Sequence, residues 1–368
     1  MRRILSGFIM TGKAGGVDRY LLNFLEANQG QDVRIDFLTN KKDKELEQYL
    51  EKKGSKLYEV TTLRHPKKQA EQIREIIEHG QYDMTYFNIS TAIECVAARV
   101  AYKLQVPSRV IHSHSSGIDK ENFLARMLYT ILHKFGKSVL HNYGTTWLAC
   151  SKKAGYFMYP KKVVESQKFQ VVYNAVDRNR FIYDEGLRMR MQRKFEVEDK
   201  LVIGHFGNYL YAKNYPFLLD VFEALYDREP DAVLFLIGEG PEKECMIREV
   251  EKRGIKEAVY FLSWQEDTNA FYQMFDILLL PSRFEGLPIV GVEAQSTKLS
   301  CLLSDSITPE AQITDHCFFM SLQKSPVLWA KKLQDMSDYV REDIQFLEEA
   351  KYYDLNEQKE QLKEISWL

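Results

Sequence analysis

Short apolar runs rich in β-branched and aromatic residues alternate with amphipathic stretches along the whole chain. In the first half, runs at 4–10, 33–39 and 84–88 are separated by helical patterns such as 17–27 and 68–79. The second half repeats the scheme, with apolar runs at 201–206, 232–237, 259–262, 277–280 and 299–303. This alternation predicts an α/β fold with parallel sheets covered by helices. Ligands on such sheets bind at the carboxyl ends of the strands.

The pattern also predicts where one domain ends. A strand-like segment at 170–173 leads to Asp177, and the residues from 178 to 200 are charged, without another strand-like run. A chain of 368 residues is long enough for two cores of ordinary size. We therefore expect one domain over 1–178 and a second that begins at residue 179.

Charge is divided unevenly between these halves. Residues 1–178 contain 28 Lys and Arg against 18 Asp and Glu, a balance of +10, which leaves −12 for the remainder. A basic first half is expected to face an anionic partner, and a nucleic acid, a membrane surface and a phosphate-bearing acceptor all fit. The first residues lack the apolar stretch of a signal peptide, and no apolar run is long enough to cross a bilayer, so we expect a cytoplasmic location.

Two segments in the first half are candidates for a site. Gly15 and Gly16 lie in a loop over 11–18 that follows the first apolar run and opens a helix. Such a loop suits an anion but also an ordinary tight turn. His112 and His114 stand at the end of a predicted strand. They could be core residues or metal ligands, but no second cluster of ligands completes a metal site, and their position favours a place in a cleft.

The third candidate follows the apolar run at 277–280. Glu285, Gly286 and Leu287 precede Pro288, which suits a first helical turn, and Glu293 lies about two helical turns further on. Free N–H groups at this helix start could hold phosphate, and the second carboxylate could accept bonds from a ribose diol. The same residues would equally fit two solvated glutamates beside a turn.

This third segment, Glu-Gly-Leu-Pro-x-x-x-x-Glu-Ala, resembles the signature of the retaining glycosyltransferases of family 4. Other parts of the chain resemble that family's motifs in the same order, including the histidine pair of its bacterial capsule and exopolysaccharide members. These parts are Gly15–Asp18, His112–His114, Val172–Asp177, Gly238–Pro241, Phe261–Ser263 and Tyr352–Asp354.

The resemblance implies the GT-B fold, in which two facing Rossmann-like domains enclose the active site in a cleft. Residues 1–178 would then bind the acceptor, and residues 179–352 would bind the nucleotide sugar. A last helix over about 353–368 would cross back onto the first domain.

The resemblance also implies a role for each matching residue. Glu285 and the amides of Gly286 and Leu287 would hold the donor sugar and diphosphate, and Glu293 would hold the ribose. The base would pack near the loop Phe261–Trp264, which contains Leu262.

A lysine and an arginine after the first strand of the second domain neutralise the diphosphate in the family. Lys213 matches the lysine, but Asn208 occupies the arginine position. Asparagine carries no charge, and the guanidinium fork is lost. Arg283, beside the glutamate loop, is the residue that would compensate.

The implied reaction moves a sugar from a nucleotide diphosphate, expected to be UDP, with retention at the anomeric carbon. Lys213 and Glu285 would act at the diphosphate, while His114 and His112 would line the sugar and acceptor side. The expected acceptor is a glycan or a lipid-linked sugar of capsule or exopolysaccharide synthesis. No Asp-x-Asp motif stands at a strand end, so no metal or other cofactor is expected. A sugar-nucleotide epimerase and a catalytically impaired nucleotide-sugar-binding protein remain alternatives.

Residues 123–140 bear on the acceptor. Apolar residues from Leu124 to Phe135 recur at helical spacing, interrupted by Arg126, His133, Lys134 and Lys137. A helix packed on the core and a helix at a lipid interface both fit this pattern. The basic first half favours the lipid interface, so we expect peripheral attachment to the inner face of the plasma membrane, with no nucleic acid bound.

Overall fold

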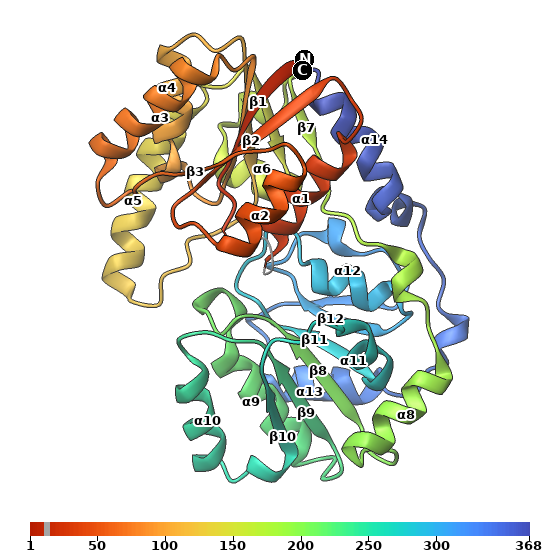
Figure 1. The fold of residues 1–368 in the computed structure, drawn as a ribbon. Coiled ribbons are helices and arrows are strands. Elements are labelled where there is room, and N and C mark those ends of the chain that lie inside the picture. The colour runs from red at the N-terminus through yellow and green to blue at the C-terminus, as the bar shows by residue number, and fades with distance from the viewer. Residues whose placement is uncertain (11–14) are drawn as a thin grey trace. The chain divides into compact units, whose positions relative to one another are not determined.

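The chain folds into two compact units, which are described here one at a time (Figure 1). The computed structural model describes residues 1–10 and 15–368. Unit 1 consists of Met1–Ile118, Phe123–Ala175 and Leu355–Leu368, and unit 2 consists of Asp119–Asn122 and Val176–Asp354.

Unit 1 is built on a parallel sheet of seven strands in the order β3-β2-β1-β4-β5-β6-β7. Ile4 in β1 pairs with Ile35 of β2 on one side and with Met84 of β4 on the other. All six residues of β4 are buried, as expected for a central strand that helices cover on both faces. The strands are β1 (Arg2–Gly7), β2 (Val33–Thr39), β3 (Leu57–Glu59), β4 (Met84–Ile89), β5 (Ser108–Ser113), β6 (Thr146–Ala149) and β7 (Phe169–Val171).

Two helical layers cover this sheet, and the apolar faces of its strands divide into two cores accordingly. One core lies under α3 (Pro66–Gly80), α4 (Val96–Lys103), α5 (Phe123–Leu140), α6 (Lys152–Met158) and α7 (Lys161–Val164), with the short 3₁₀ helix η1 (Ala92–Glu94). The other lies under α1 (Gly16–Ala27), α2 (Lys44–Lys52) and α14 (Leu355–Ile365).

The last helix, α14, belongs to unit 1 although unit 2 precedes it in the chain (Figure 1). Leu362 and Ile365 are buried in the same core as α1. The Asn23 side-chain amide donates to Gln358 Oε1 over 2.9 Å, and Gln358 Nε2 donates to the Tyr173 carbonyl over 2.6 Å. The expectation that a final helix returns to the first half's fold is therefore confirmed.

Unit 2 contains a parallel sheet of six strands in the order β10-β9-β8-β11-β12-β13. Ile203 of β8 pairs with Leu234 of β9 and with Ile277 of β11, so β8 and β11 are direct neighbours. The strands are β8 (Val202–Phe206), β9 (Val233–Ile237), β10 (Val259–Leu262), β11 (Ile277–Leu280), β12 (Ser300–Ser304) and β13 (Cys317–Met320).

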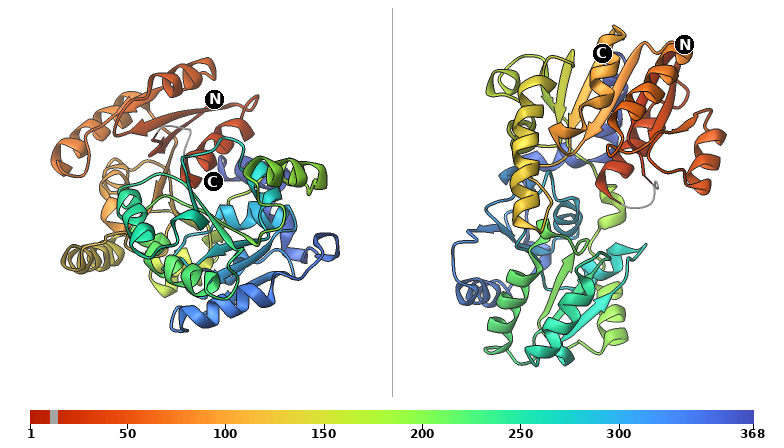
Figure 2. Two further views of the ribbon diagram at one scale, coloured as in Figure 1. Left: turned by 90° about the horizontal axis from the view of Figure 1, so that it is seen from below. Right: turned by 90° about the vertical axis from the view of Figure 1, so that its left-hand side faces the viewer.

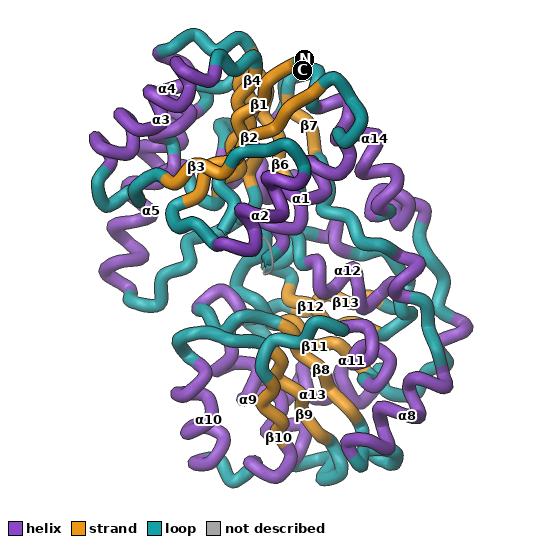
Figure 3. Tube along the Cα trace, in the orientation of Figure 1, coloured by secondary structure: helices purple, strands orange, loops and turns teal. Residues whose placement is uncertain are grey.

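Helices cover both faces of this sheet too (Figure 3). The helices α9 (Tyr215–Tyr226), α10 (Lys243–Lys252) and α13 (Pro326–Asp335) share a core with one face. On the other face, Phe195 of α8 (Glu185–Phe195) contacts Phe235 and also Phe271 of α11 (Thr268–Met274). Helix α12 (Ile289–Ser296) also packs on that face, where its Gly291 lies beside Leu280 and Leu303. Short 3₁₀ helices occur at Arg178–Phe181, Tyr211–Lys213, Lys256–Ala258, Pro309–Ala311, Arg341–Asp343 and Glu348–Tyr353.

Both sheets follow the doubly wound strand order, in which the chain adds strands first to one side of the starting strand and then to the other. The reversal falls between β1 and β4 in unit 1 and between β8 and β11 in unit 2. The predicted α/β class with two Rossmann-like folds is therefore confirmed. Among the described helices, none combines the length and apolarity needed to span a membrane.

The docking of α14 on unit 1 gives a first prediction. Leu362→Ala removes a fully buried side chain and should lower the free energy of unfolding by about 2–5 kcal/mol. Urea unfolding, followed by circular dichroism, measures this loss. Glu364→Ala, at an exposed position of the same helix, should change it by less than about 0.5 kcal/mol. Equal effects of the two substitutions would show that α14 does not pack on unit 1 in solution.

Candidate functional site

The loops after β8 and β11 emerge side by side at the carboxyl edge of the unit 2 sheet. In the sheet, β9 and β10 lie beyond β8, whereas β12 and β13 lie beyond β11. The connections that follow β8 and β11 therefore run to opposite sides of the sheet. Open α/β sheets bind ligands at this point of divergence. The loop after β8 contains Asn208 and Lys213, and the loop after β11 contains Glu285.

An ion pair joins the two loops. Lys213 Nζ lies 2.7 Å from Glu285 Oε1, and the Ser282 hydroxyl donates to the same oxygen over 2.8 Å. The two charged side chains are only 16% and 14% exposed, so solvent screens the pair less than it would a surface pair. The arrangement fixes a primary amine and a carboxylate at the carboxyl edge of the sheet.

Further bonds hold the two loops together. Asn214, which adopts a left-handed backbone conformation at φ 61°, donates from Nδ2 to the Pro281 carbonyl over 3.0 Å. The Arg283 amide donates to the Ala212 carbonyl over 2.7 Å. The Arg283 guanidinium stacks 4.2 Å from the ring of Tyr211 and donates to its carbonyl. Arg283 thus braces the β8 loop. Its guanidinium, which was expected to compensate for the missing charge at Asn208, makes these contacts with Tyr211.

The loop after β9 packs tightly against the loop after β8, and glycines make this approach possible. A Cβ on Gly238 would lie 2.1 Å from the Gly207 carbonyl oxygen, and one on Gly240 would lie 2.7 Å from the Tyr209 nitrogen. Both glycines have positive φ values, 154° and 153°. Asn208, between the packed residues 207 and 209, has an exposed side chain.

Helix α12 carries the second glutamate of the motif. Its start follows the buried residues Gly286 and Leu287, with Pro288 at the N-cap position. The buried Tyr272 of α11 donates its hydroxyl to Glu293 Oε2 over 2.8 Å. Burial, followed by the nearby Glu293 carboxylate, raises the pKa of the Tyr272 hydroxyl well above its usual value, which keeps it a donor. Tyr272 therefore orients Glu293.

At the end of β10 lies the predicted base-binding loop. The Leu262 carbonyl accepts from the Gly238 amide over 3.0 Å, which ties the ends of β9 and β10 together. Trp264 follows two residues later and is 54% exposed. Hydrogen bonds from Ser263 and then Lys243 lower the pKa of the Glu239 carboxyl. The exposed Trp264 thus directly follows Ser263, which hydrogen-bonds a carboxylate at the same edge of the sheet.

The two predicted histidines lie in unit 1, at the carboxyl end of β5. His112 is fully buried, and its Nδ1 lies 2.8 Å from the Tyr86 hydroxyl, which in turn lies 2.6 Å from the Tyr20 hydroxyl. His114 keeps partial exposure, and its Nε2 lies 2.7 Å from Asn88 Oδ1. The two rings are 4.1 Å apart. Of the pair, only His114 is therefore partly exposed, and His112 belongs to the core.

Burial makes both histidines neutral at physiological pH. It lowers the pKa of His112 well below its usual value and that of His114 to about 3. Since an amide oxygen only accepts, His114 Nε2 carries the proton, and Nδ1 is left with a lone pair. Within the described residues, His114 Nδ1 and His112 Nε2 have no hydrogen-bond partner.

The glycine loop of unit 1 is described only in part. Residues 11–14 of the predicted loop lie outside the described residues, whereas Gly15, at φ 104°, directly precedes α1, which begins at Gly16. A cavity of about 390 Å³ lies at the carboxyl ends of β1, β2 and β4. Its lining includes Asn40, Gln69, Asn88, Ser90 and Glu94.

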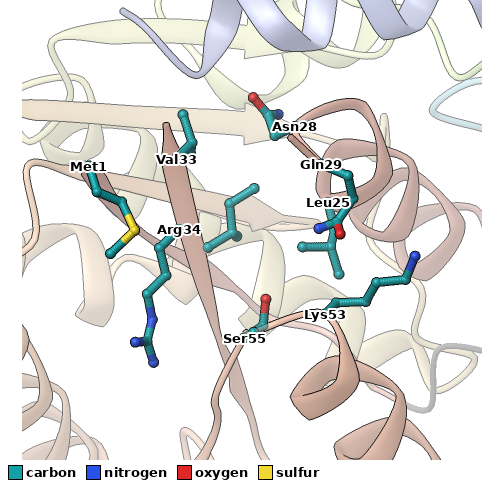
Figure 4. Close-up of a pocket in the computed structure, with 10 residues that line it drawn as sticks. Met1, Leu25, Asn28, Gln29, Val33, Arg34, Lys53 and Ser55 are labelled. Atoms are coloured by element: carbon teal, nitrogen blue, oxygen red, sulfur yellow. The ribbon is translucent and has the colours of Figure 1, made fainter. Parts of the chain in front are cut away.

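A second cavity in unit 1, of about 220 Å³, lies at the opposite edge of the sheet (Figure 4). Met1, Val33 and Arg34, from the amino ends of β1 and β2, line it together with residues of the helix ends. Since doubly wound sheets bind ligands at the carboxyl edge, this cavity does not belong to the candidate site. Among the described residues, no group of three or more His, Cys, Asp or Glu side chains could hold a metal ion. Metal independence itself stays a prediction.

Models of known protein families match both units of the chain. The sequence profile of the Glycosyltransferase Family 4 matches residues 14–180, and that of Glycosyl transferases group 1 matches residues 189–339. The chain belongs to the family 4-like glycosyltransferases. The resemblance found in the sequence motifs is thereby confirmed.

Relatives of this glycosyltransferase cover from about half to nearly all of its length. EpsF of Bacillus subtilis (strain 168), which carries a provisional glycosyltransferase name, is 27% identical over 356 residues, covering 94% of this chain and 90% of EpsF. The O-antigen biosynthesis glycosyltransferase WclY of Escherichia coli is 25% identical, covering 53% of this chain and 61% of WclY.

Anabaena HepE, solved in complex with UDP and glucose, has a similar fold, with a TM-score of 0.76, 14% identity and 99% of each chain covered. At this level of identity the likeness shows the GT-B fold of the glycosyltransferase and no more.

The buried neutral histidines of unit 1 predict a pH dependence. The unfolded chain protonates each histidine near pH 6.5, but the folded unit does not, so stability is lost as the pH falls below about 6.5. Between pH 7 and about 5.5, each such histidine should cost roughly 1 kcal/mol of unfolding free energy. His114→Gln should reduce that loss in urea unfolding, and His79→Gln, at an exposed position, is the matched control. Equal losses in wild type and His114→Gln would contradict a neutral His114.

Proposed function

We propose that this glycosyltransferase transfers a sugar from a nucleotide diphosphate, UDP by preference, to a glycan with retention at the anomeric carbon. The ion pair between Lys213 and Glu285 at the carboxyl edge of unit 2 is the observation that carries the proposal. The UDP and glucose bound by HepE, and the O-antigen biosynthesis named for WclY, support the donor and the acceptor class.

The donor diphosphate fits the edge where the β8 and β11 loops diverge. Lys213 supplies a cation there, and Glu285 together with Ser282 fixes the position of the ammonium group. In the reaction, the bond between the anomeric carbon and the diphosphate oxygen breaks, and its electron pair stays on the diphosphate. Lys213 stabilises the negative charge that develops on this leaving group. In this proposal the Lys213 side chain neutralises the charge of the diphosphate, so no metal ion is required.

The nucleoside fits beside the diphosphate. Glu293, held by the Tyr272 hydroxyl, presents a carboxylate that accepts hydrogen bonds from the ribose diol. Trp264, exposed at the end of β10, offers an aromatic face to the base.

The acceptor glycan fits the 390 Å³ cavity of unit 1, whose lining includes several uncharged amide and hydroxyl side chains. The side-chain nitrogens of Asn40 and Gln69 donate to backbone carbonyls, so their amide oxygens are the acceptors for sugar hydroxyls, and the Ser90 hydroxyl is a donor as well as an acceptor. The neutral His114 is bonded to Asn88, which also lines this cavity, so it stands next to the bound acceptor. The acceptor hydroxyl gives its proton to the departing diphosphate oxygen as its own oxygen forms the new bond to the anomeric carbon.

A two-stage experiment tests this function. UDP-, GDP- and ADP-sugars are first screened for thermal stabilisation of the protein, since a ligand that binds only the folded state raises the melting temperature. The stabilising sugar nucleotide is then incubated with glycan acceptors and also alone. Transfer with retained anomeric configuration is expected. Conversion of the sugar nucleotide without any acceptor would favour an epimerase, and binding without turnover would favour a binding protein.

Removal of the amine at the edge of the unit 2 sheet should impair the chemical step. Lys213→Ala should lower kcat at least about tenfold, because a cation contact to the developing charge is lost in a shielded site. Steady-state transfer kinetics measure the effect. Lys256→Ala removes another lysine of unit 2, which is exposed and paired with Glu251, and should leave kcat within about twofold. A Lys213→Ala enzyme with full kcat would place the diphosphate elsewhere.

The assignment of Glu293 to the ribose can be tested with a matched pair of ligands. Glu293→Gln should weaken UDP binding roughly tenfold or more, because a charged acceptor is replaced by a neutral one that still accepts from Tyr272. Calorimetric titration of UDP and 2′,3′-dideoxy-UDP separates the ribose contact from other effects. The variant should bind the dideoxy ligand as the wild type does. An equal loss for both ligands would remove Glu293 from the ribose site.

A further inference from the structure

Helix α5 of unit 1 presents its large apolar side chains outward. Seven of them are 43–72% exposed. They form three adjacent pairs and one single residue, which repeat every four positions, so they share one side of the helix. Figures 1 and 2 show α5 at the periphery of the helical layer of unit 1. We call this surface the α5 apolar face, and it consists of Phe123, Leu124, Met127, Leu128, Ile131, Leu132 and Phe135.

The opposite side of α5 is fixed to unit 1 by polar and small residues. The Ala92 amide donates to Nδ1 of the buried His133 over 3.1 Å, and His133 Nε2 therefore donates to the Phe157 carbonyl, 3.0 Å away. A Cβ on the buried Gly136 would lie 2.3 Å from the Ala92 carbonyl oxygen, so helix and η1 are in direct backbone contact. Rotating the helix to bury its apolar face would break all of these contacts.

The charges of α5 itself are positive, whereas Asp119 and Glu121 precede the helix. None of the 18 residues of α5 is acidic, and Lys134 is exposed within it. Lys137 donates to the carbonyl of Tyr156, an exposed aromatic residue of α6, and the exposed Lys152 lies one turn before Tyr156. The segment 1–178, which supplies most of unit 1, carries a balance of +10. An anionic partner matches these charges.

We propose that the α5 apolar face inserts into the headgroup region of a membrane that contains anionic lipid. A helix with Phe and Leu on one side and Lys and Arg on its flanks lies in the plane of such an interface, with its apolar side chains among the acyl chains. The lysines then face the lipid phosphates, and salt should weaken their attraction. This attachment goes beyond the proposed sugar transfer and would bring unit 1 to lipid-linked acceptors.

Vesicle sedimentation with the full chain tests the attachment. The protein should bind vesicles of phosphatidylglycerol and phosphatidylcholine at about 0.05 M NaCl, bind them weakly at about 0.5 M NaCl, and bind pure phosphatidylcholine vesicles weakly throughout. Ile131→Glu should reduce binding at least tenfold. Leu328→Glu changes another exposed apolar residue, in α13 of unit 2, and this variant should bind as the wild type does.

Insertion has its own readout. The fluorescence of Phe135→Trp should be quenched by lipids brominated on their acyl chains, beyond the quenching seen in the wild type. The proposal would be overturned if the wild-type protein did not bind anionic vesicles at low salt. It would also be overturned if the Ile131→Glu variant bound them as strongly as the wild type. Concentration-dependent self-association that Ile131→Glu abolishes, without any lipid binding, would instead assign the face to a second copy of the chain. Thermal stabilisation by sugar nucleotides reports on unit 2 and should be the same in all these variants.

Discussion

Parallel pairing of the strands places every loop that follows a strand at one edge of its sheet. In unit 2 this constraint acts together with the reversal of strand order between β8 and β11. Lys213 and Glu285 are 72 residues apart in the chain, yet neighbouring strands deliver them to the same point. The ion pair, the brace from Arg283 and the carboxylate of α12 all depend on that register. In unit 1 the same constraint gathers the ends of β1, β2 and β4 around a cavity.

The strands and the glutamate motif could be predicted because their signal is local. The buried run of β11 and the Glu-Gly-Leu-Pro segment that follows it are continuous in the sequence. The partners that orient these glutamates could not be found in this way. Tyr272 bonds Glu293 from a helix 21 residues earlier, and in the sequence it is one aromatic among several in an amphipathic stretch. Such a contact exists only once α11 and α12 pack on the same face.

Helix α5 shows a different limit of sequence analysis. A stripe of Leu, Met, Ile and Phe at helical spacing looks the same whether it faces a core or the exterior. The orientation is set by His133 and Gly136, whose contacts with Ala92 draw the other side of the helix inward. The histidine pair was similarly ambiguous, since only the burial of β5 separates the core residue His112 from the partly exposed His114.

The place of α14 has a consequence for the order in which the protein is made. The polypeptide leaves unit 1 after Ala175 and returns to it at Leu355, and the outgoing and returning segments pair where Val176 bridges to Asp354. Unit 2 is thus almost wholly an insertion within unit 1. During translation, the strands of unit 1 are synthesised first, but unit 1 is complete only when its last helix has been made. Unit 2 is synthesised almost entirely as one uninterrupted segment. The half of the protein that begins folding first is therefore the half that finishes last, and until then the part of its core that Leu362 and Ile365 cover stays exposed to solvent.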